Sequence, residues 1–186
     1  MKELENYRGA FNPHIKYEDF SKDVIVKLLI EYSRTHLATL GTWHNVVEQR
    51  FGEKESVDGD IIRSLTTRWR AYGFIRSALN IQGDTVETFF KTMQVGPGMA
   101  LGIHDIEWDL KNPYHGIFTV KWCSALEHFE RQGKGYEIPV CYIEEPPTFG
   151  SAARSINPRI RLMPLKLPPR KSKGETACKW EVKLDR

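Results

Sequence analysis

The strongest candidates for chemistry in this sequence are two cysteines and a glutamate: Cys123, Glu127 and Cys141. Cys123 ends a predicted strand, and Ser124 is suited to open a helix, so we expect the thiol at a helix N-terminus, where peptide dipoles favour a thiolate. Glu127 follows about one helical turn later, on the same side. Two chemistries fit this spacing. Cys123 would be a nucleophile or metal ligand with Glu127 as general base, or Cys123, Glu127 and Cys141 would bind a metal such as zinc.

The three cysteines also have a purely structural explanation. None of them forms the Cys-x-x-Cys pair that is typical of zinc knuckles. Cys178 shares the apolar face of a predicted final strand with Trp180 and Val182, and free cysteines are among the most buried residues in proteins. We therefore expect Cys178 to be structural, whereas for Cys123 and Cys141 both explanations stay open.

Composition narrows the class of protein. The chain has 186 residues, of which 40% are hydrophobic and 27% charged, and its apolar runs are far shorter than the ~20 residues that cross a bilayer. The acidic residues near Met1 do not fit a signal peptide. With three cysteines, an odd number, this favours a soluble cytoplasmic protein with reduced thiols over a disulfide framework. A net charge of +3 is too small to indicate a nucleic-acid partner by itself.

Aromatic residues and histidines supply further candidate ligand contacts. Trp43, Trp69 and Trp108 are expected to line a cavity between the helices and the sheet. His104 shares the parity of Trp108 on a predicted strand, and it is either a ligand contact or a hydrogen-bonded core histidine. His44 lies beside Trp43 and either lines the same cavity or forms the edge of its helix.

A basic stretch near the C-terminus is the remaining candidate site. Seven basic residues and no acidic one occur from Arg154 to Lys173. Arg159 and Arg161 would lie on one face of a strand, where they could hold phosphates or a carboxylate ligand. The stretch lacks interleaved aromatic residues, however, and a solvated turn is the better explanation of its charges.

Hydrophobic periodicity predicts the elements that position these residues. Helical spacing covers 22–51, 55–80 and a short segment after Thr85, and alternation predicts strands at 103–110 and 117–123. A short helix should follow at 124–132, and two last strands at 159–166 and 176–184. At Gly41, within the first helix, we expect a bend or a close contact.

These elements together predict an α+β fold in which long N-terminal helices pack on a C-terminal antiparallel sheet of about four strands with short helices. Residues 1–21 are expected to form an irregular arm. A single domain would cover 22–186, with a helical half at 22–95 and a sheet half at 103–186.

The C-terminal half also carries a pattern that resembles a known family. The matching residues are Asn157-Pro158-Arg159-Ile160, Leu165 to Lys173, Cys178-Lys179-Trp180-Glu181 and, more loosely, Gly116 to Cys123, Glu127, Gly133, Cys141, Gly41, Trp43, Phe51 and Gly52. They resemble an uncharacterised prokaryotic cytosolic-protein family related to L-2-amino-thiazoline-4-carboxylate hydrolase-like proteins. The resemblance implies a small ligand-binding α+β domain or a ring-opening hydrolase. Relatives often carry further cysteines where this chain has Leu167 and Ala177, which places a shared four-thiolate cluster in doubt.

Three functions follow as hypotheses. The first is a small-molecule-binding domain of unknown ligand, with a cysteine-based metal or thiol site. The second is a hydrolase that acts on a C–N bond of a small cyclic or amide substrate, with Cys123 and Glu127 as its catalytic residues. The third is a nucleic-acid accessory protein that uses the basic stretch 154–173. A homodimer is compatible with each of them.

Overall fold

A computed structural model describes residues 3–96, 99 and 103–185, without the side chains of residues 68 and 69. In chain order the helical elements are η1 (Tyr17–Asp19), α1 (Lys22–Phe51), α2 (Glu53–Ala78), α3 (Val86–Gln94), α4 (Ser124–Gln132), the π-helical segment η2 (Pro139–Glu144) and α5 (Glu145–Ile156). The strands are β1 (His104–Asn112), β2 (His115–Cys123), β3 (Ile160–Lys166) and β4 (Cys178–Leu184). The predicted α+β class is confirmed. No helix in the described ranges is long and apolar enough to span a bilayer.

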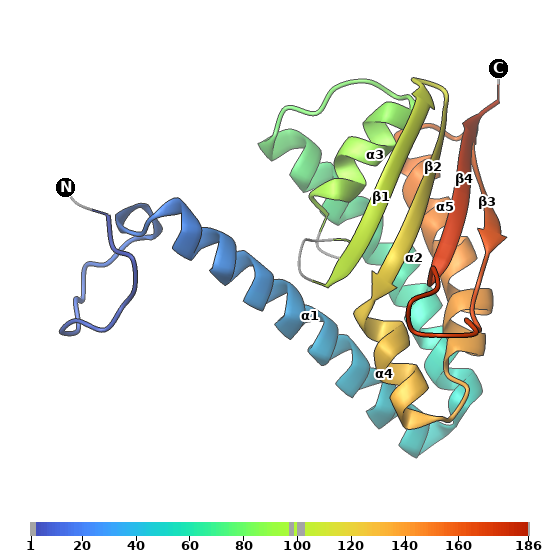
Figure 1. The fold of residues 1–186 in the computed structure, drawn as a ribbon, viewed down its shortest axis with the longest axis horizontal. Coiled ribbons are helices and arrows are strands. Elements are labelled where there is room, and N and C mark those ends of the chain that lie inside the picture. The colour runs from blue at the N-terminus through green and yellow to red at the C-terminus, as the bar shows by residue number, and fades with distance from the viewer. Residues whose placement is uncertain (1–2, 97–98, 100–102, 186) are drawn as a thin grey trace.

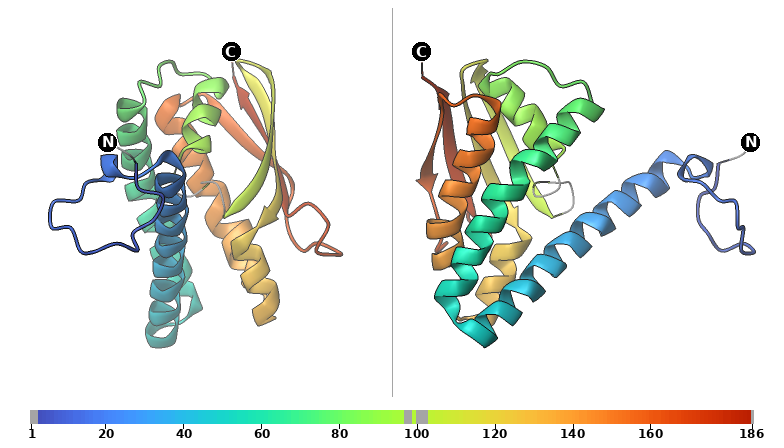
Figure 2. Two further views of the ribbon diagram at one scale, coloured as in Figure 1. Left: turned by 60° about the vertical axis from the view of Figure 1, so that its left-hand side comes forward. Right: turned by 180° about the vertical axis from the view of Figure 1, so that it is seen from behind.

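The strands form one antiparallel sheet in the order β1-β2-β4-β3. Helices α2, α3 and α5 lie on one face of this sheet, and α1 runs outside them (Figures 1 and 2). The core lies between the sheet and these helices. Phe118 of β2 stacks on Trp180 of β4 with ring centroids 6.3 Å apart, and Phe90 and Phe149 bring α3 and α5 against the same rings. Burial of this aromatic cluster fixes the helical layer on the sheet.

Helix α5 and η2 are the elements that the sequence pattern did not predict. The prolines at 139, 146 and 147 interrupt the apolar periodicity and look like helix breakers. In the structure they stand at or near the first positions of η2 and α5, where a missing N–H costs no hydrogen bond. Helix α5 therefore inserts a central helix into the half of the chain that we expected to be mainly sheet.

Helix α2 buries part of the apolar face that its periodicity predicts and, in addition, a polar stripe. Among the apolar positions that helical spacing places on one face, Val57 and Tyr72 are buried, whereas Leu65 and Leu79 have exposed fractions of 36% and 58%. The buried positions include Ser56, Asp60 and Ser64, which recur every four residues and so lie on one helical face. This polar stripe faces the site described below.

Helix α1 reaches the rest of the molecule only with its C-terminal half. Its N-terminal half extends away from the sheet and the other helices (Figure 1), and α1 contains no buried residue. At Gly41, where we expected a bend or a close contact, an added Cβ would meet no atom within 4 Å. The expectation of a close contact is therefore wrong, because Gly41 borders open space.

Candidate functional site

A cavity of about 600 Å³ lies between the α1–α2 hairpin, the start of α4, η2 and the end of the sheet. Its walls combine two chemical surfaces. The helices α1 and α2 contribute most of the polar side chains. The sheet and α5 contribute mainly apolar ones, among them Val120, Phe149 and Trp180, together with the polar His104 and Glu145. A volume of this size is within the range of small-molecule sites in proteins.

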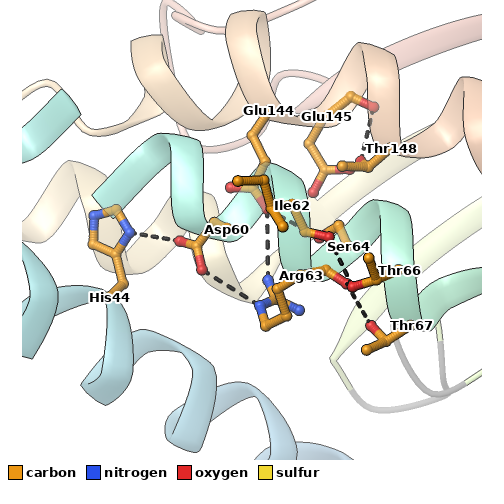
Figure 3. Close-up of polar contacts among 10 residues, drawn as sticks. All are labelled: His44, Asp60, Ile62, Arg63, Ser64, Thr66, Thr67, Glu144, Glu145 and Thr148. Atoms are coloured by element: carbon orange, nitrogen blue, oxygen red, sulfur yellow. Dashed lines mark hydrogen bonds and ion pairs between the residues drawn. The ribbon is translucent and has the colours of Figure 1, made fainter. Parts of the chain in front are cut away.

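The polar wall is a chain of hydrogen bonds and ion pairs (Figure 3). Nδ1 of His44 lies 2.7 Å from Oδ2 of Asp60, and Nε of Arg63 lies 3.4 Å from Oδ1 of the same carboxylate. Arg63 continues to Glu144, with 3.7 Å between Nη2 and Oε1. Ser64 donates to the same Glu144 oxygen at 3.5 Å. The network joins α1, α2 and η2, so it fixes three walls of the cavity relative to one another.

The three cysteines all line the cavity. Cys123 is the N-cap of α4, and its sulfur accepts the N–H of Leu126 at 3.4 Å. The position that we expected to favour a thiolate is therefore present. Burial nevertheless outweighs the hydrogen bond and raises the pKa of the Cys123 thiol. The thiol is held in its protonated form.

The other two thiols are protonated for the same reason. Burial, with a contribution from the Glu145 carboxylate, raises the pKa of Cys141. Burial also raises the pKa of Cys178 to about 12, although Nε1–H of Trp180 donates to its sulfur at 3.4 Å. Cys178, which we expected to be structural, thus lines the cavity together with Cys123 and Cys141. At neutral pH the cavity presents three uncharged thiols.

His104 carries a buried polar atom without a hydrogen-bond partner. Within the described ranges, Nδ1 of His104 is the one buried side-chain nitrogen or oxygen that has no hydrogen-bond partner. His104 lines the cavity and pairs with Cys123 across β1 and β2. Burial lowers the pKa of His104 to about 4, so the imidazole is neutral at physiological pH. A neutral imidazole that faces a cavity offers one hydrogen bond to a molecule inside it.

The Glu127 carboxylate, which we predicted to act with Cys123, pairs with Arg170. This carboxylate and that of Glu130 bind the guanidinium of Arg170, whose side chain is 1% exposed. The Nε and Nη2 atoms of Arg170 each lie 2.7 Å from a Glu130 oxygen. Arg170 belongs to the loop between β3 and β4, so this ion pair fastens that loop to α4. The described part of the chain contains no group of three or more His, Cys, Asp or Glu side chains arranged to hold a metal.

The remaining predicted ligand contacts are divided between this cavity and other places. His44 and His104 are in its wall. Trp43 lies on the outer side of α1 with 60% of its surface exposed, and Trp108 packs on Phe90 and Phe118 of the core. The side chain of Trp69 lies outside the described residues.

The predicted basic stretch does not form one cationic surface. Arg161 pairs with Asp185 at 3.2 Å, and Lys166 pairs with Glu175 at 2.5 Å. Arg170 is buried between two glutamates. Arg159 and Arg161 are not among the residues that line the cavity.

Sequence reasoning missed the acidic and basic residues of the polar wall: Asp60, Arg63 and Glu144. The available signal was the four-residue spacing of Ser56, Asp60 and Ser64 on one face of α2. A polar stripe of this kind on a long helix marks a face that packs against other polar groups. Glu144 is the last residue of the unexpected η2 and had no such signal.

Comparison of the chain with models of protein families, with curated proteins and with solved structures found no match. The family resemblance noted from the sequence therefore stays a prediction.

Proposed function

We propose that the chain binds a small, uncharged and largely apolar molecule in the cavity, with a hydroxyl or similar polar group directed at Nδ1 of His104. The single observation that carries the proposal is the unpartnered, buried Nδ1 of His104, a residue that lines a cavity of about 600 Å³. A buried polar atom without a partner costs about 1–3 kcal/mol, and a ligand group that bonds to it recovers part of this cost. A hydroxyl fits because it can donate or accept, whichever imidazole nitrogen carries the proton.

The character of the other walls supports a neutral and apolar body for the ligand. Trp180 and Phe149 offer ring surfaces, and the three thiols are protonated. Protonated thiols behave as small apolar groups. On the opposite wall Arg63 pairs with Asp60 at 3.4 Å and with Glu144 at 3.7 Å, and the Glu145 carboxylate also lines the cavity.

The hydrolase alternative is less well supported by the geometry. A nucleophilic Cys123 would need a thiolate, but burial raises the pKa of its thiol. Glu127, the base in that hypothesis, is held by Arg170. The nucleic-acid alternative has a comparable weakness, because acidic partners bind Arg161, Lys166 and Arg170.

Two fluorescent probes test the proposal. 2-Naphthol and naphthalene have the same apolar body, and only 2-naphthol carries a hydroxyl. We expect 2-naphthol to bind with 1:1 stoichiometry and about 5- to 10-fold more tightly, as one hydrogen bond predicts. In His104→Phe this preference should disappear, because the imidazole acceptor is gone.

A matched pair of glycine variants localises the binding. Gly41 and Gly59 are both helical, and an added Cβ at either position meets nothing within 4 Å, but only Gly41 lines the cavity. Gly41→Leu should weaken the binding of both probes at least tenfold by filling the cavity, while Gly59→Leu should leave it unchanged. Equal binding by the two variants, or no binding by the wild type, would contradict the proposal.

A further inference from the structure

Helix α1 carries an exposed and largely apolar stripe beside the face with which His44 contacts α2. The spacing along this stripe alternates between four and three residues, as in the contact positions of a coiled coil. This outer stripe consists of Ile25, Leu29, Tyr32, His36, Thr39, Trp43 and Val46. Leu29, Tyr32 and Trp43 have exposed fractions of 59%, 55% and 60%, whereas Ile25 is half-buried. The N-terminal arm reaches the stripe at one point, where the hydroxyls of Tyr17 and Tyr32 are 3.1 Å apart. We propose that the outer stripe of α1 pairs with the outer stripe of a second copy of this chain.

The exposure of the stripe follows from the placement of α1. The N-terminal half of the helix extends beyond the sheet and the other helices, as Figure 1 and the right-hand view of Figure 2 show. Residues 24–30 read Val-Ile-Val-Lys-Leu-Leu-Ile, which is far more apolar than a helix in water on all sides requires. Each square ångström of apolar surface left in water costs about 25 cal/mol. A partner that covers this helix therefore stabilises the protein.

The distribution of charged residues on α1 favours pairing of the outer stripe with a second copy of itself. No Lys, Arg, Asp or Glu occurs in the outer stripe or at the positions that flank it, which are Val26, Leu28, Ser33, Thr35, Leu40, Thr42 and Val47. Lys27, Glu31 and Arg34 lie on the other side of the helix. Two copies of the stripe therefore approach without charge repulsion. A lipid surface is less suited, because helices that lie on membranes flank their apolar face with Lys and Arg.

The stripe is self-complementary when two copies run antiparallel with His36 at the centre. In that register Leu29 meets Trp43 of the other copy, and Ile25 meets Val47, so large apolar residues pair at both ends. The antiparallel order also places the two sheet domains at opposite ends, because only the C-terminal half of α1 contacts its own domain (Figure 1). Opposed helix dipoles favour the same order.

The length of the stripe suits a stable dimer. From Ile25 to Val46 it spans about 32 Å at 1.5 Å per residue. Two helices in contact over this length, together with the sides of the domains that then adjoin, bury on the order of 1,500 Å², as stable dimers do. His36 belongs both to the stripe and to the lining of the cavity.

Sedimentation velocity of the full chain tests the pairing. We expect the wild type to sediment at twice the chain mass of 21.5 kDa and Leu29→Glu at the mass of one chain. The circular dichroism spectrum of Leu29→Glu should equal that of the wild type. Phe74→Glu is the control, since Phe74 is 74% exposed on α2 and lies outside the stripe; this variant should remain a dimer. A monomeric wild type between about 1 and 100 µM, or a dimeric Leu29→Glu, would overturn the proposal.

Disulfide crosslinking tests the antiparallel order. In the proposed register His36→Cys lies opposite itself, whereas two copies of Leu29→Cys are about 21 Å apart along the helix, beyond the ~7 Å that a disulfide bridges. We expect His36→Cys to give a reducible dimer under mild oxidation, and Leu29→Cys and the wild type to give none. Crosslinking of Leu29→Cys as complete as that of His36→Cys would overturn the antiparallel order. The proposed ligand binding does not depend on either result, because 2-naphthol binding can be measured with the monomer as well as with the dimer.

Discussion

Nδ1 of His44 lies 2.7 Å from the Asp60 carboxylate and thereby joins α1 to α2 at the edge of the cavity. The side chains are 13% and 10% exposed, and Arg63 bonds to the second oxygen of the same carboxylate. This link stands where the two long helices are still close together, before α1 leaves the rest of the molecule. It is the connection on which the geometry of the polar wall depends.

We expect Asp60→Ala to lower the free energy of unfolding by about 1–3 kcal/mol, because both His44 and Arg63 lose a buried partner. Urea unfolding followed by circular dichroism measures the change. Asp58→Ala is the control: Asp58 is exposed and pairs with Lys54 one helical turn away, so its loss should cost no more than about 0.5 kcal/mol. Equal losses in the two variants would show that the Asp60 network contributes nothing beyond a surface ion pair.

Arg170→Met should cost more, about 3–5 kcal/mol, because it leaves the Glu127 and Glu130 carboxylates without the buried cation between them. Lys171→Met, at the next and exposed position, should be neutral within about 0.5 kcal/mol. Thermal unfolding of both variants distinguishes the outcomes. A stable Arg170→Met would mean that the β3–β4 loop holds its place without this ion pair.

Stability should depend on pH through His104. Its pKa is about 4 in the folded chain, below the ordinary 6.5, so between these values the unfolded chain binds a proton that the folded chain does not. The contribution of His104 is complete above pH 6.5 and declines as the pH falls toward 4, by up to about 1.4 kcal/mol per pH unit. Urea unfolding at several pH values should show this slope in the wild type and a smaller one in His104→Phe. An NMR titration midpoint of His104 near 6.5 would refute the expectation.

The three thiols should react slowly. Since the pKa of each is raised by burial, their thiolate fraction at pH 7.5 is small, and iodoacetamide should modify the native protein at least about tenfold more slowly than the urea-unfolded chain. Mass spectrometry after timed quenching identifies each cysteine. Rapid modification of Cys123 alone in the native protein would instead favour the hydrolase hypothesis.

Much of the fold was accessible from the sequence, because its elements obey simple periodicities. The apolar spacing of 22–51 and the alternation in 117–123 predicted α1 and most of β2, and Cys123 was correctly expected at the start of α4. Helix α5 was not predicted, since its prolines occupy a helix start that periodicity cannot distinguish from a break.

The candidate site was less accessible for a related reason. A pattern along the chain reports which residues share a face, but not which faces meet. His44 and His104 were noticed as polar residues near aromatic ones, whereas their relation to the cavity depends on how α2, η2 and the sheet come together. Glu127 shows the converse: its spacing from Cys123 suited catalysis, yet Arg170, 43 residues further along the chain, determines its partner.

The attachment of the β3–β4 loop has a consequence for how a molecule would reach the interior. Leu167, in the cavity wall, is followed by Pro168, whose carbonyl accepts the hydroxyl of Tyr142, and by the Arg170 ion pair. The β3–β4 loop can therefore move away from this side of the cavity only after these contacts break. The opposite side is formed by α1, which has no buried residue. We expect solutes to enter and leave along α1, and the rate of exchange to follow the small hinge-like displacements of that helix rather than any opening of the loop.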